Sequence, residues 1–472
     1  MSNTTSIATN AFSAGDTAWI LTSAAMVFIM IPGLGFFYAG MARSQAALSM
    51  LFLCMLSVAI VSIEWFLWGY SLALTPSSNP FIGNFNHAVF TGLVSPDARN
   101  PNAPTVHALV YAIYQSMFAA ITPALAFGVV ENRARILPAM VFLFVWSTLV
   151  YNFVTYWNWA PRGWAHTLGV LDFAGGVPVH TVAGMAALAY AIKLGPRPEF
   201  KSGAHVKPHN YVYILLGTAM LWFGWFGDNA GSEGAANART ANAFVVTNLS
   251  ACVSAMTWTI VSYFREDKKW GSFGFCGGAV AGLVVITPAC GYVAPWTAVI
   301  FGICSGVLCN YAIDLKHKLN YDDSLDVFAV HAVGGILGTF LTGIFAQSYI
   351  INLDGTQANG GWLDGNWIQV PIQLASIATG AVWSFVVTYI ILMAFDYIPF
   401  LRLRLNKDQE ELGMDAVEMG ENVYGFGVLS HGGNTANWPV SAKHPHFSSS
   451  NNMDELEPLH ENSAAVVDVA SL

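Results

Sequence analysis

The stretch DFAGGVPVH, residues Asp172–His180, opens a strongly apolar segment that continues to Ile192. An acid stands at its start and a histidine lies inside it. A second stretch, DVFAVHAVGG at Asp326–Gly335, repeats this combination in another apolar segment. An ionisable side chain inside a membrane span indicates a functional site. His180 and His331, unlike the other ten histidines, lie well inside long apolar runs, so they require a joint explanation.

The composition is that of a polytopic membrane protein. Of the 472 residues, 55% are hydrophobic and 10% are charged, whereas soluble domains carry about 25% charged residues. No basic cluster of the kind that binds nucleic acid is present. Most of the eleven apolar segments have the ~20 residues needed to cross a ~30 Å hydrocarbon core. They run over Ala18–Met41, Ala46–Ala73, Ala108–Val130, Ile136–Tyr156, Ala174–Ile192, Tyr211–Gly227, Ala241–Phe264, Phe273–Val293, Trp296–Leu315, Val327–Gln347 and Ile368–Phe400.

The order of these segments predicts an all-α fold with eleven transmembrane helices in two inverted five-helix halves plus one extra helix. Segments one to five and six to ten each end in a segment that has an aspartate, then a histidine, and a Gly-Gly pair nearby. Because five spans are an odd number, the two halves must be inverted relative to each other. Inverted repeats of this kind place the substrate path at their interface.

The distribution of Lys and Arg predicts the orientation. Connections after odd-numbered segments hold twelve of these residues, and connections after even-numbered segments hold three. The odd-numbered exits and the C-terminus are therefore predicted to be cytoplasmic, and the N-terminus extracellular. Asn3 begins an Asn-Thr-Thr sequon on the predicted outer side, so we expect it to be glycosylated.

Four regions follow from this topology. Residues 1–17 form an extracellular N-terminus, and residues 18–400 form the transmembrane transport domain. Residues 401–429 form a polar cytoplasmic region that we expect to pack on the inner face. Residues 430–472 are rich in Ser, Asn, His, Pro and Glu, which is typical of a disordered tail.

The tail contains a serine cluster, Ser448, Ser449 and Ser450, followed by acidic residues. Phosphorylation there would add roughly −1.5 to −2 charges per site. A kinase and signalling partners are therefore predicted to act on the tail and to change gating. The alternative is a solvated tail without function.

The positions of the two histidines predict that their rings meet. If Asp172 caps the fifth helix and the tenth starts near Asp323, each histidine lies roughly 12 Å inside its own boundary. A ~30 Å core then leaves a gap of about 6 Å, which tilt can close. Two neutral imidazoles in contact can share a proton and hydrogen-bond a small polar molecule. The alternatives are two independent core histidines and, less favoured for want of a third ligand, a metal pair; no metal or cofactor is predicted.

Several residues near the outer ends of their segments favour a cation site. Trp159, Phe118 and Trp164 offer aromatic faces, which attract small cations by up to ~2 kcal/mol when desolvated. The alternative is an interfacial aromatic belt. Asp172 has the alternative role of a helix N-cap, and the Ser232 hydroxyl that of a back-bonded packing group. Glu64, inside the second segment, receives no predicted role.

At this point the chain resembles the ammonium transporters of the Amt/Mep/Rh superfamily, and most closely a fungal ammonium permease of the high-affinity type. The resemblance extends to about Tyr424 and rests on Asp172–Gly176 with His180, on GWFGDNAGS at Gly224–Ser232, on TPACGY at Thr287–Tyr292, on Asp322–His331 and on Gly413–Tyr424.

The resemblance implies a homotrimer in the plasma membrane with one pore per subunit, active in nitrogen utilisation. It places Trp159, Phe118 and Ser232 at an outer ammonium recruitment site and makes Asp172 the essential acid. His180 and His331 correspond to the twin histidines of the pore. With a histidine at position 180, the chain is similar to those family members that also act as nitrogen sensors.

One position departs from the family pattern. Members usually carry a second gating phenylalanine directly after Trp-Phe-Gly, and here that residue is Asp228. A two-ring gate with Phe118 is therefore in question, and an acid at this place would instead attract a cation.

The predicted function is uptake of ammonium, and of methylammonium, across the plasma membrane. Ammonium is recruited outside and deprotonated, ammonia passes the histidines, and the proton can follow through the histidine pair. Carrying the full charge through a dry tube would be very costly, and potassium has no proton to lose. The sequence contains no HExxH, GxSxG or P-loop pattern, so an enzyme is not predicted. The rival hypotheses are a nitrogen-sensing receptor with little flux and an intramembrane enzyme.

Overall fold

The computed structural model describes residues 11–77, 79–202, 207–266, 268–421 and 423. Within these ranges the chain is helical, and its extended pairings are two isolated β-bridges. The predicted modification sites Asn3, Ser448, Ser449 and Ser450 lie outside the described residues, as does the predicted tail 430–472.

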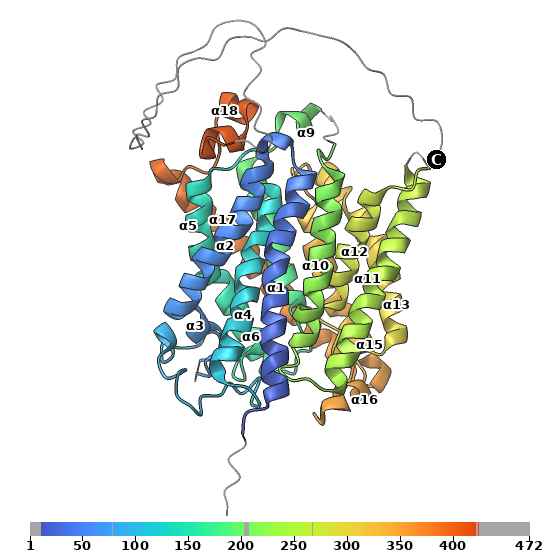
Figure 1. Cartoon of the computed structure of the whole chain (residues 1–472). Helices are drawn as coiled ribbons and strands as arrows, with labels where there is room; N and C mark the ends of the chain where they lie inside the picture. Colours follow the sequence, from blue (N-terminus) through green and yellow to red (C-terminus); the bar gives the residue numbers. More distant parts are fainter. Residues whose placement is uncertain (1–10, 78, 203–206, 267, 422, 424–472) are drawn as a thin grey trace, which may run out of the picture. The chain divides into compact units, whose positions relative to one another are not determined.

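Helices occur at all eleven predicted positions (Figure 1). In the described part of the chain, nine helical segments are long and apolar enough to cross a membrane. They are Ala14–Met41 (α1), Ser44–Leu74 (with α2, Ala47–Glu64, and α3, Tyr70–Leu74), Ala108–Val129 (with α4, Ala108–Leu125), Ile136–Thr167 (with α5, Ile136–Trp146, α6, Asn152–Trp159, and α7, Trp164–Thr167), Gly176–Leu194 (with α8, Val182–Leu194), Ala238–Arg265 (α11), Pro295–Leu319 (with α13, Pro295–Ala312, and α14, Leu315–Leu319), Phe328–Phe345 (with α15, Val333–Phe345) and Gln369–Tyr397 (α17). The sixth and eighth predicted segments form α10 (Tyr211–Gly231) and α12 (Ser272–Ile286).

The ends of two helices differ from the predicted segments for local reasons. The eighth segment was expected to reach Val293, but α12 ends at Ile286. Pro288 follows closely, and a proline has no N–H to continue the helical ladder. The fifth segment starts at Gly176 rather than at Ala174, because Gly175 has a φ of +116° and so lies outside the helical region.

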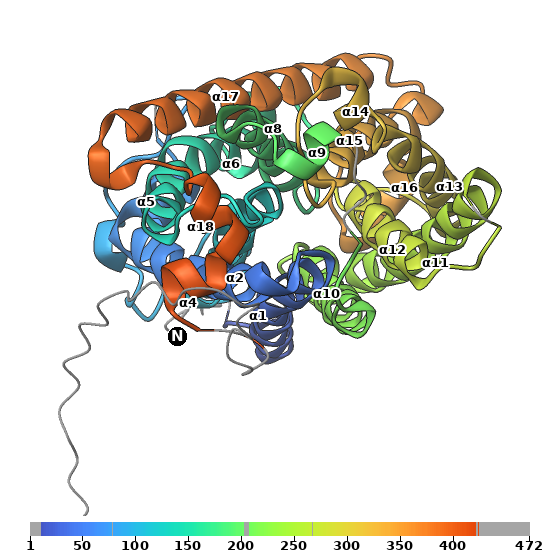
Figure 2. The ribbon, with the colours of Figure 1, turned by 90° about the horizontal axis from the view of Figure 1, so that it is seen from above.

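The two halves of the chain contact each other along α1 and α10. Small residues on both helices allow this approach. A Cβ added at Gly33 would lie 2.8 Å from Met220 Cβ, and one added at Gly40 would lie 2.6 Å from the Asn210 carbonyl oxygen. Seen along the helix axes, α2 to α8 lie on one side and α11 to α15 on the other, and α17 runs along both (Figure 2).

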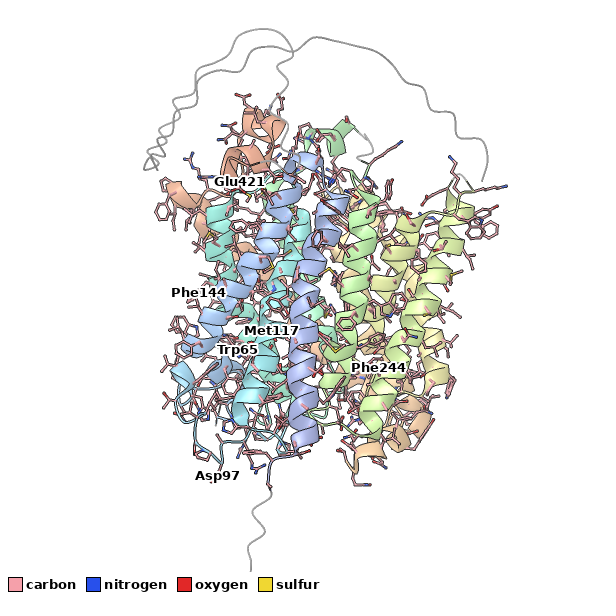
Figure 3. The ribbon with its side chains drawn as sticks, viewed as in Figure 1. Trp65, Asp97, Met117, Phe144, Phe244 and Glu421 are labelled. Atoms are coloured by element: carbon pink, nitrogen blue, oxygen red, sulfur yellow. The ribbon has the colours of Figure 1, made fainter. Side chains whose placement is uncertain are left out.

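The two ends of the helical bundle are named here after one residue at each end, the Asp172 face and the Arg404 face. The Asp172 face holds the last turn of α6, where Trp159 contacts Asp172. The Arg404 face holds α9 (Pro198–Ser202) and α18 (Lys407–Leu412), where Arg404 contacts Glu410; α9 and α18 lie at the same end of the bundle (Figure 1). The charged residues Asp97 and Glu421 lie at opposite ends of the helices, and the apolar Phe144 and Phe244 lie along their sides (Figure 3). Large apolar side chains exposed along the sides, such as Phe223, Val382 and Ile390, suit contact with lipid.

The segment after α17 is held to the Arg404 face by backbone and side-chain contacts. The Leu405 amide donates to the Arg133 carbonyl oxygen at 2.8 Å. The Asp415 carboxylate accepts from the amides of Leu48 (3.0 Å) and Ser49 (2.7 Å), at the start of α2. An acid at a helix N-terminus satisfies otherwise unpaired amides. The described part of this segment is thus bound to the first half of the bundle.

Candidate functional site

The two histidines of the apolar stretches are in direct contact. His180 Nδ1 lies 3.2 Å from His331 Nδ1, and the ring centroids are 5.3 Å apart. Each histidine lies in a π-helical turn at the start of a membrane span, Gly176–Thr181 and Phe328–Ala332 respectively. Such π-bulges are frequent at functional sites. The alternative of two independent core histidines does not describe this geometry, because each Nδ1 has the other as its partner.

A tryptophan for which the sequence predicts no role orients this pair. The Trp225 ring is stacked on the His180 ring with centroids 5.4 Å apart. Its Nε1 donates to Thr287 Oγ1 at 2.9 Å, and that hydroxyl donates to the Leu283 carbonyl oxygen. The indole is thus fixed from α12. The run Gly-Trp-Phe-Gly signals this site, but the sequence does not show which ring the indole would contact.

One cavity of about 1150 Å³ contains the histidine pair and extends to the Arg404 face. Away from its mouth the wall holds the acid Asp228 and is otherwise largely apolar, with Met30, Leu34, Val179, Ile121, Leu125 and Leu221 among its residues. Its mouth is polar and is lined by Lys207, Arg265, Lys269, Asp314, Lys316 and Asp326. The Lys316 ammonium group lies 2.6 Å from Asp326 Oδ1. The molecule therefore has an apolar lumen that opens at a charged rim.

Aromatic rings close the lumen toward the Asp172 face. Phe118 is fully buried, and its ring meets that of Trp159 edge to face with centroids 6.1 Å apart. The ring of Tyr114, one turn earlier on α4, also contacts that of Phe118 edge to face, with the ring centroids 5.1 Å apart. Trp164, the third predicted aromatic residue, packs instead against Trp157 at 6.2 Å. The structure thus brings Phe118 and Trp159 together and places Trp164 elsewhere.

Ser232 lies beside this aromatic layer, directly after α10. Its Oγ donates to the Asp228 carbonyl oxygen at 2.8 Å and lies 3.2 Å from the Tyr114 hydroxyl. The back-bonded arrangement considered from the sequence is therefore present. The hydroxyl also lies near Phe118 through Tyr114, so the three residues predicted for the outer site are neighbours.

Asp172 holds the backbone that leads to His180. Its Oδ1 accepts from the amides of Gly175 (2.9 Å) and Gly176 (2.7 Å), and its Oδ2 accepts from Val177 (2.7 Å). The Asp172 carbonyl oxygen accepts from Trp159 Nε1 at 2.9 Å. Burial raises the pKa of the carboxyl to about 6, against the effect of the three amide donors. Asp172 is a helix cap that also positions the Trp159 ring.

Glu64 is fully buried between the second and fourth spans. Its Oε1 accepts from Thr148 Oγ1 at 2.9 Å and from Asn152 Nδ2 at 2.8 Å. These donors lie at the junction of α5 and α6. Glu64 therefore links the second and fourth spans, neither of which carries His180 or His331. In the described ranges no three His, Cys, Asp or Glu side chains are placed to hold a metal ion.

Known proteins share both the sequence pattern and the fold. A sequence model described as the Ammonium Transporter Family matches residues 18–424. Ammonium transporter 1 of Schizosaccharomyces pombe is 48% identical over 413 residues, which cover 87% of this chain and 82% of the relative. The crystal structure of Candida albicans Mep2 is 45% identical with a TM-score of 0.80, covering 84% of this chain and 87% of that one. A structure titled Sensor Amt Protein is 27% identical with a TM-score of 0.77, covering 86% and 98% of the two chains.

The helical bundle, the apolar lumen and its charged mouth define a multi-pass membrane transport protein. The chain belongs to the Ammonium Transporter Family and, within it, to the fungal ammonium transporters of the Amt/Mep type. Ammonium is its substrate, and its activity is transport rather than catalysis of a covalent reaction.

Proposed function

We propose that this transporter separates ammonium into ammonia and a proton and that the pair His180–His331 conducts both. Ammonium collects at Trp159, Phe118 and Ser232, where aromatic faces and a hydroxyl oxygen suit a small cation with N–H donors. Asp172 keeps Trp159 in place through its carbonyl oxygen and contributes negative charge.

Deprotonation removes the main barrier to passage. An ion in a medium of low dielectric constant costs tens of kcal/mol, whereas a neutral amine needs only hydrogen-bond partners. One N–H bond of ammonium breaks, its electron pair stays on nitrogen, and the proton is accepted by an imidazole nitrogen. Ammonia then moves along the lumen to the charged mouth. Potassium is rejected because it cannot lose a proton.

The single observation that supports this mechanism most is the 3.2 Å contact between the two Nδ1 atoms inside an apolar lumen. One Nδ1 must carry the hydrogen that the other accepts. Transfer of that hydrogen changes the tautomers of both rings together, so a proton that arrives on one ring can leave from the other.

The setting of this mechanism is the plasma membrane, with the Asp172 face outside and the Arg404 face in the cytoplasm. The twelve-to-three bias of basic residues supports this orientation. Three copies of the chain form the transporter, each with its own lumen. Glycosidase should shift the mobility of the mature protein, and Asn3→Gln should remove that shift. Cleavage of a tag at Leu472 by protease outside the cell would contradict the orientation.

A second candidate is a nitrogen sensor with little flux. The likeness to the structure titled Sensor Amt Protein favours it. Uptake of labelled methylammonium into vesicles that contain the purified protein separates the two. Saturable uptake supports transport, whereas signalling in cells without uptake in vesicles supports the sensor.

We propose that the C-terminal tail regulates transport. Truncation after Ser430 tests its importance, and replacing Ser448–Ser450 by alanine or by aspartate tests a phosphorylation switch. Equal transport by all three variants and the parent, in rich and in poor nitrogen, would exclude a regulatory role for the tail.

A further inference from the structure

Asp228 places a carboxylate in the wall of the lumen near the histidines. It follows Trp225 by three residues on α10, so both side chains lie on the same side of the helix. Both residues line the cavity. Because a helix rises ~1.5 Å per residue, Asp228 is about one turn nearer the Asp172 face than the indole stacked on His180. Tyr114, which contacts Phe118, binds the Asp228 carbonyl oxygen, so the acid lies at the aromatic layer, about one helical turn from the indole that stacks on His180.

The hydroxyls nearest to Asp228 bind its main chain. Tyr114 donates to the Asp228 carbonyl oxygen at 2.7 Å, and Ser232 donates to the same oxygen at 2.8 Å. Across the described ranges, no side chain or amide donates to the Asp228 carboxylate itself. The residue is only 4% exposed. An acid so deeply buried is normally paired or hydrogen-bonded.

The cationic residues of the cavity wall do not supply that partner. Among the described lining residues, Lys207, Arg265, Lys269 and Lys316 lie at the Arg404 face. The rest of the wall includes the apolar Met30, Ile121 and Leu125 and the rings of Trp225 and His180. His180 Nε2 is also buried without a hydrogen-bond partner. The region thus combines a free carboxylate, a free imidazole nitrogen and a π-face.

We propose that Asp228 forms a luminal binding site for a monovalent cation of the ammonium class, at the aromatic layer and about one helical turn from the Trp225 indole that stacks on His180. The carboxylate supplies the counter-charge, and the Trp225 ring lines the cavity one helical turn further from the Asp172 face. Ammonium and methylammonium are the natural occupants. Potassium has a similar charge and enters the same site, but it can only block. This inference rests on the proposed function, because it places ammonium in the lumen before the proton is lost.

Uptake kinetics test the effect on transport. Purified full-length chain in vesicles takes up labelled methylammonium, and the apparent KM and the inhibition constant of potassium are measured. Asp228→Asn keeps the volume of the side chain and removes its charge, so both constants should rise at least tenfold. Asp228→Glu should stay close to the parent. Asp97 lies at the end of the helices opposite Glu421 (Figure 3) and is not among the residues that line the cavity, so Asp97→Asn should change neither constant.

Direct detection of the ion keeps the test independent of transport. Thallium(I), a heavy monovalent cation, is soaked into crystals of the parent and of Asp228→Asn, and its anomalous signal is mapped. A peak beside Asp228 in the parent that is lost in the variant supports the site, even if vesicles of the parent show no uptake; that result would count only against the proposed function. Absence of the peak in the parent overturns the site, as does a peak that survives in Asp228→Asn.

Discussion

Asp172 and Asp323 cap two membrane spans from opposite faces of the molecule. Each carboxylate accepts the amides four and five residues further on, Gly176 and Val177 for Asp172 and Val327 and Phe328 for Asp323. Each cap is followed, eight residues after the acid, by one of the paired histidines. The two halves of the inverted repeat therefore share the same capping arrangement. Because the acid and the histidine are eight residues apart in both halves, each cap fixes the depth of its histidine ring.

The cap at Asp172 can be tested apart from transport. Asp172→Ala leaves three buried amides without an acceptor, and hydrogen bonds to a charged group contribute about 1.5–3 kcal/mol each to stability. We expect a clear fall in the unfolding temperature of the detergent-purified protein together with loss of methylammonium uptake. Asp97→Ala is the matched control. An unfolding temperature equal to that of the parent would show that the cap is not structural.

Glu64 should matter for stability rather than for the pore. Glu64→Ala leaves Thr148 and Asn152 without their acceptor and opens a cavity, which costs about 2–4 kcal/mol. Glu64→Gln keeps an acceptor oxygen, so its unfolding temperature should lie close to that of the parent. The KM of the folded fraction should be unchanged in both. A change of KM in Glu64→Gln, with stability preserved, would assign Glu64 to the transport path instead.

Glu233 predicts a pH dependence of stability. Burial raises its pKa to about 7 from an ordinary value of 4.5, against the attraction of Arg239. The folded state therefore holds a proton that the unfolded state releases between these values, so the free energy of unfolding falls as the pH rises from 4.5 to 7. Burial also raises the pKa of Asp354, but hydrogen bonds lower it further, so that residue titrates below this window.

The corresponding measurement is the unfolding temperature of the parent and of Glu233→Gln from pH 5 to pH 8. The variant has no proton to lose at this position, so its curve should be flatter than that of the parent across the window. Parallel curves would show that Glu233 is already ionised in the folded protein at pH 5.

Much of the fold follows from local patterns in the chain. The apolar segments and the Asp-then-His spacing predict the helices and the approach of the two rings, because span length and helix rise are nearly constant. The π-helical turns at His180 and His331 are not predictable in this way. They depend on how the two spans pack against each other.

Side-chain contacts between segments that lie far apart in the chain could not be predicted from the sequence either. Nothing near Trp225 in the chain shows that its ring stacks on His180, and Glu64 received no role because Thr148 and Asn152 lie more than eighty positions away. Asp228 was visible as a departure from the family pattern. Only the structure shows that hydrogen bonds engage its main chain and leave its carboxylate to the lumen.

In the proposed mechanism the histidine pair conducts ammonia and excludes potassium. The most direct test is the current, with parallel uptake, evoked by ammonium and by potassium in reconstituted membranes that contain the parent, His331→Ala, or the control His87→Ala. We expect His331→Ala either to lose ammonium transport at least tenfold or to begin to conduct potassium, while His87→Ala behaves like the parent. Unchanged ammonium transport and selectivity in a correctly folded His331→Ala protein would contradict it.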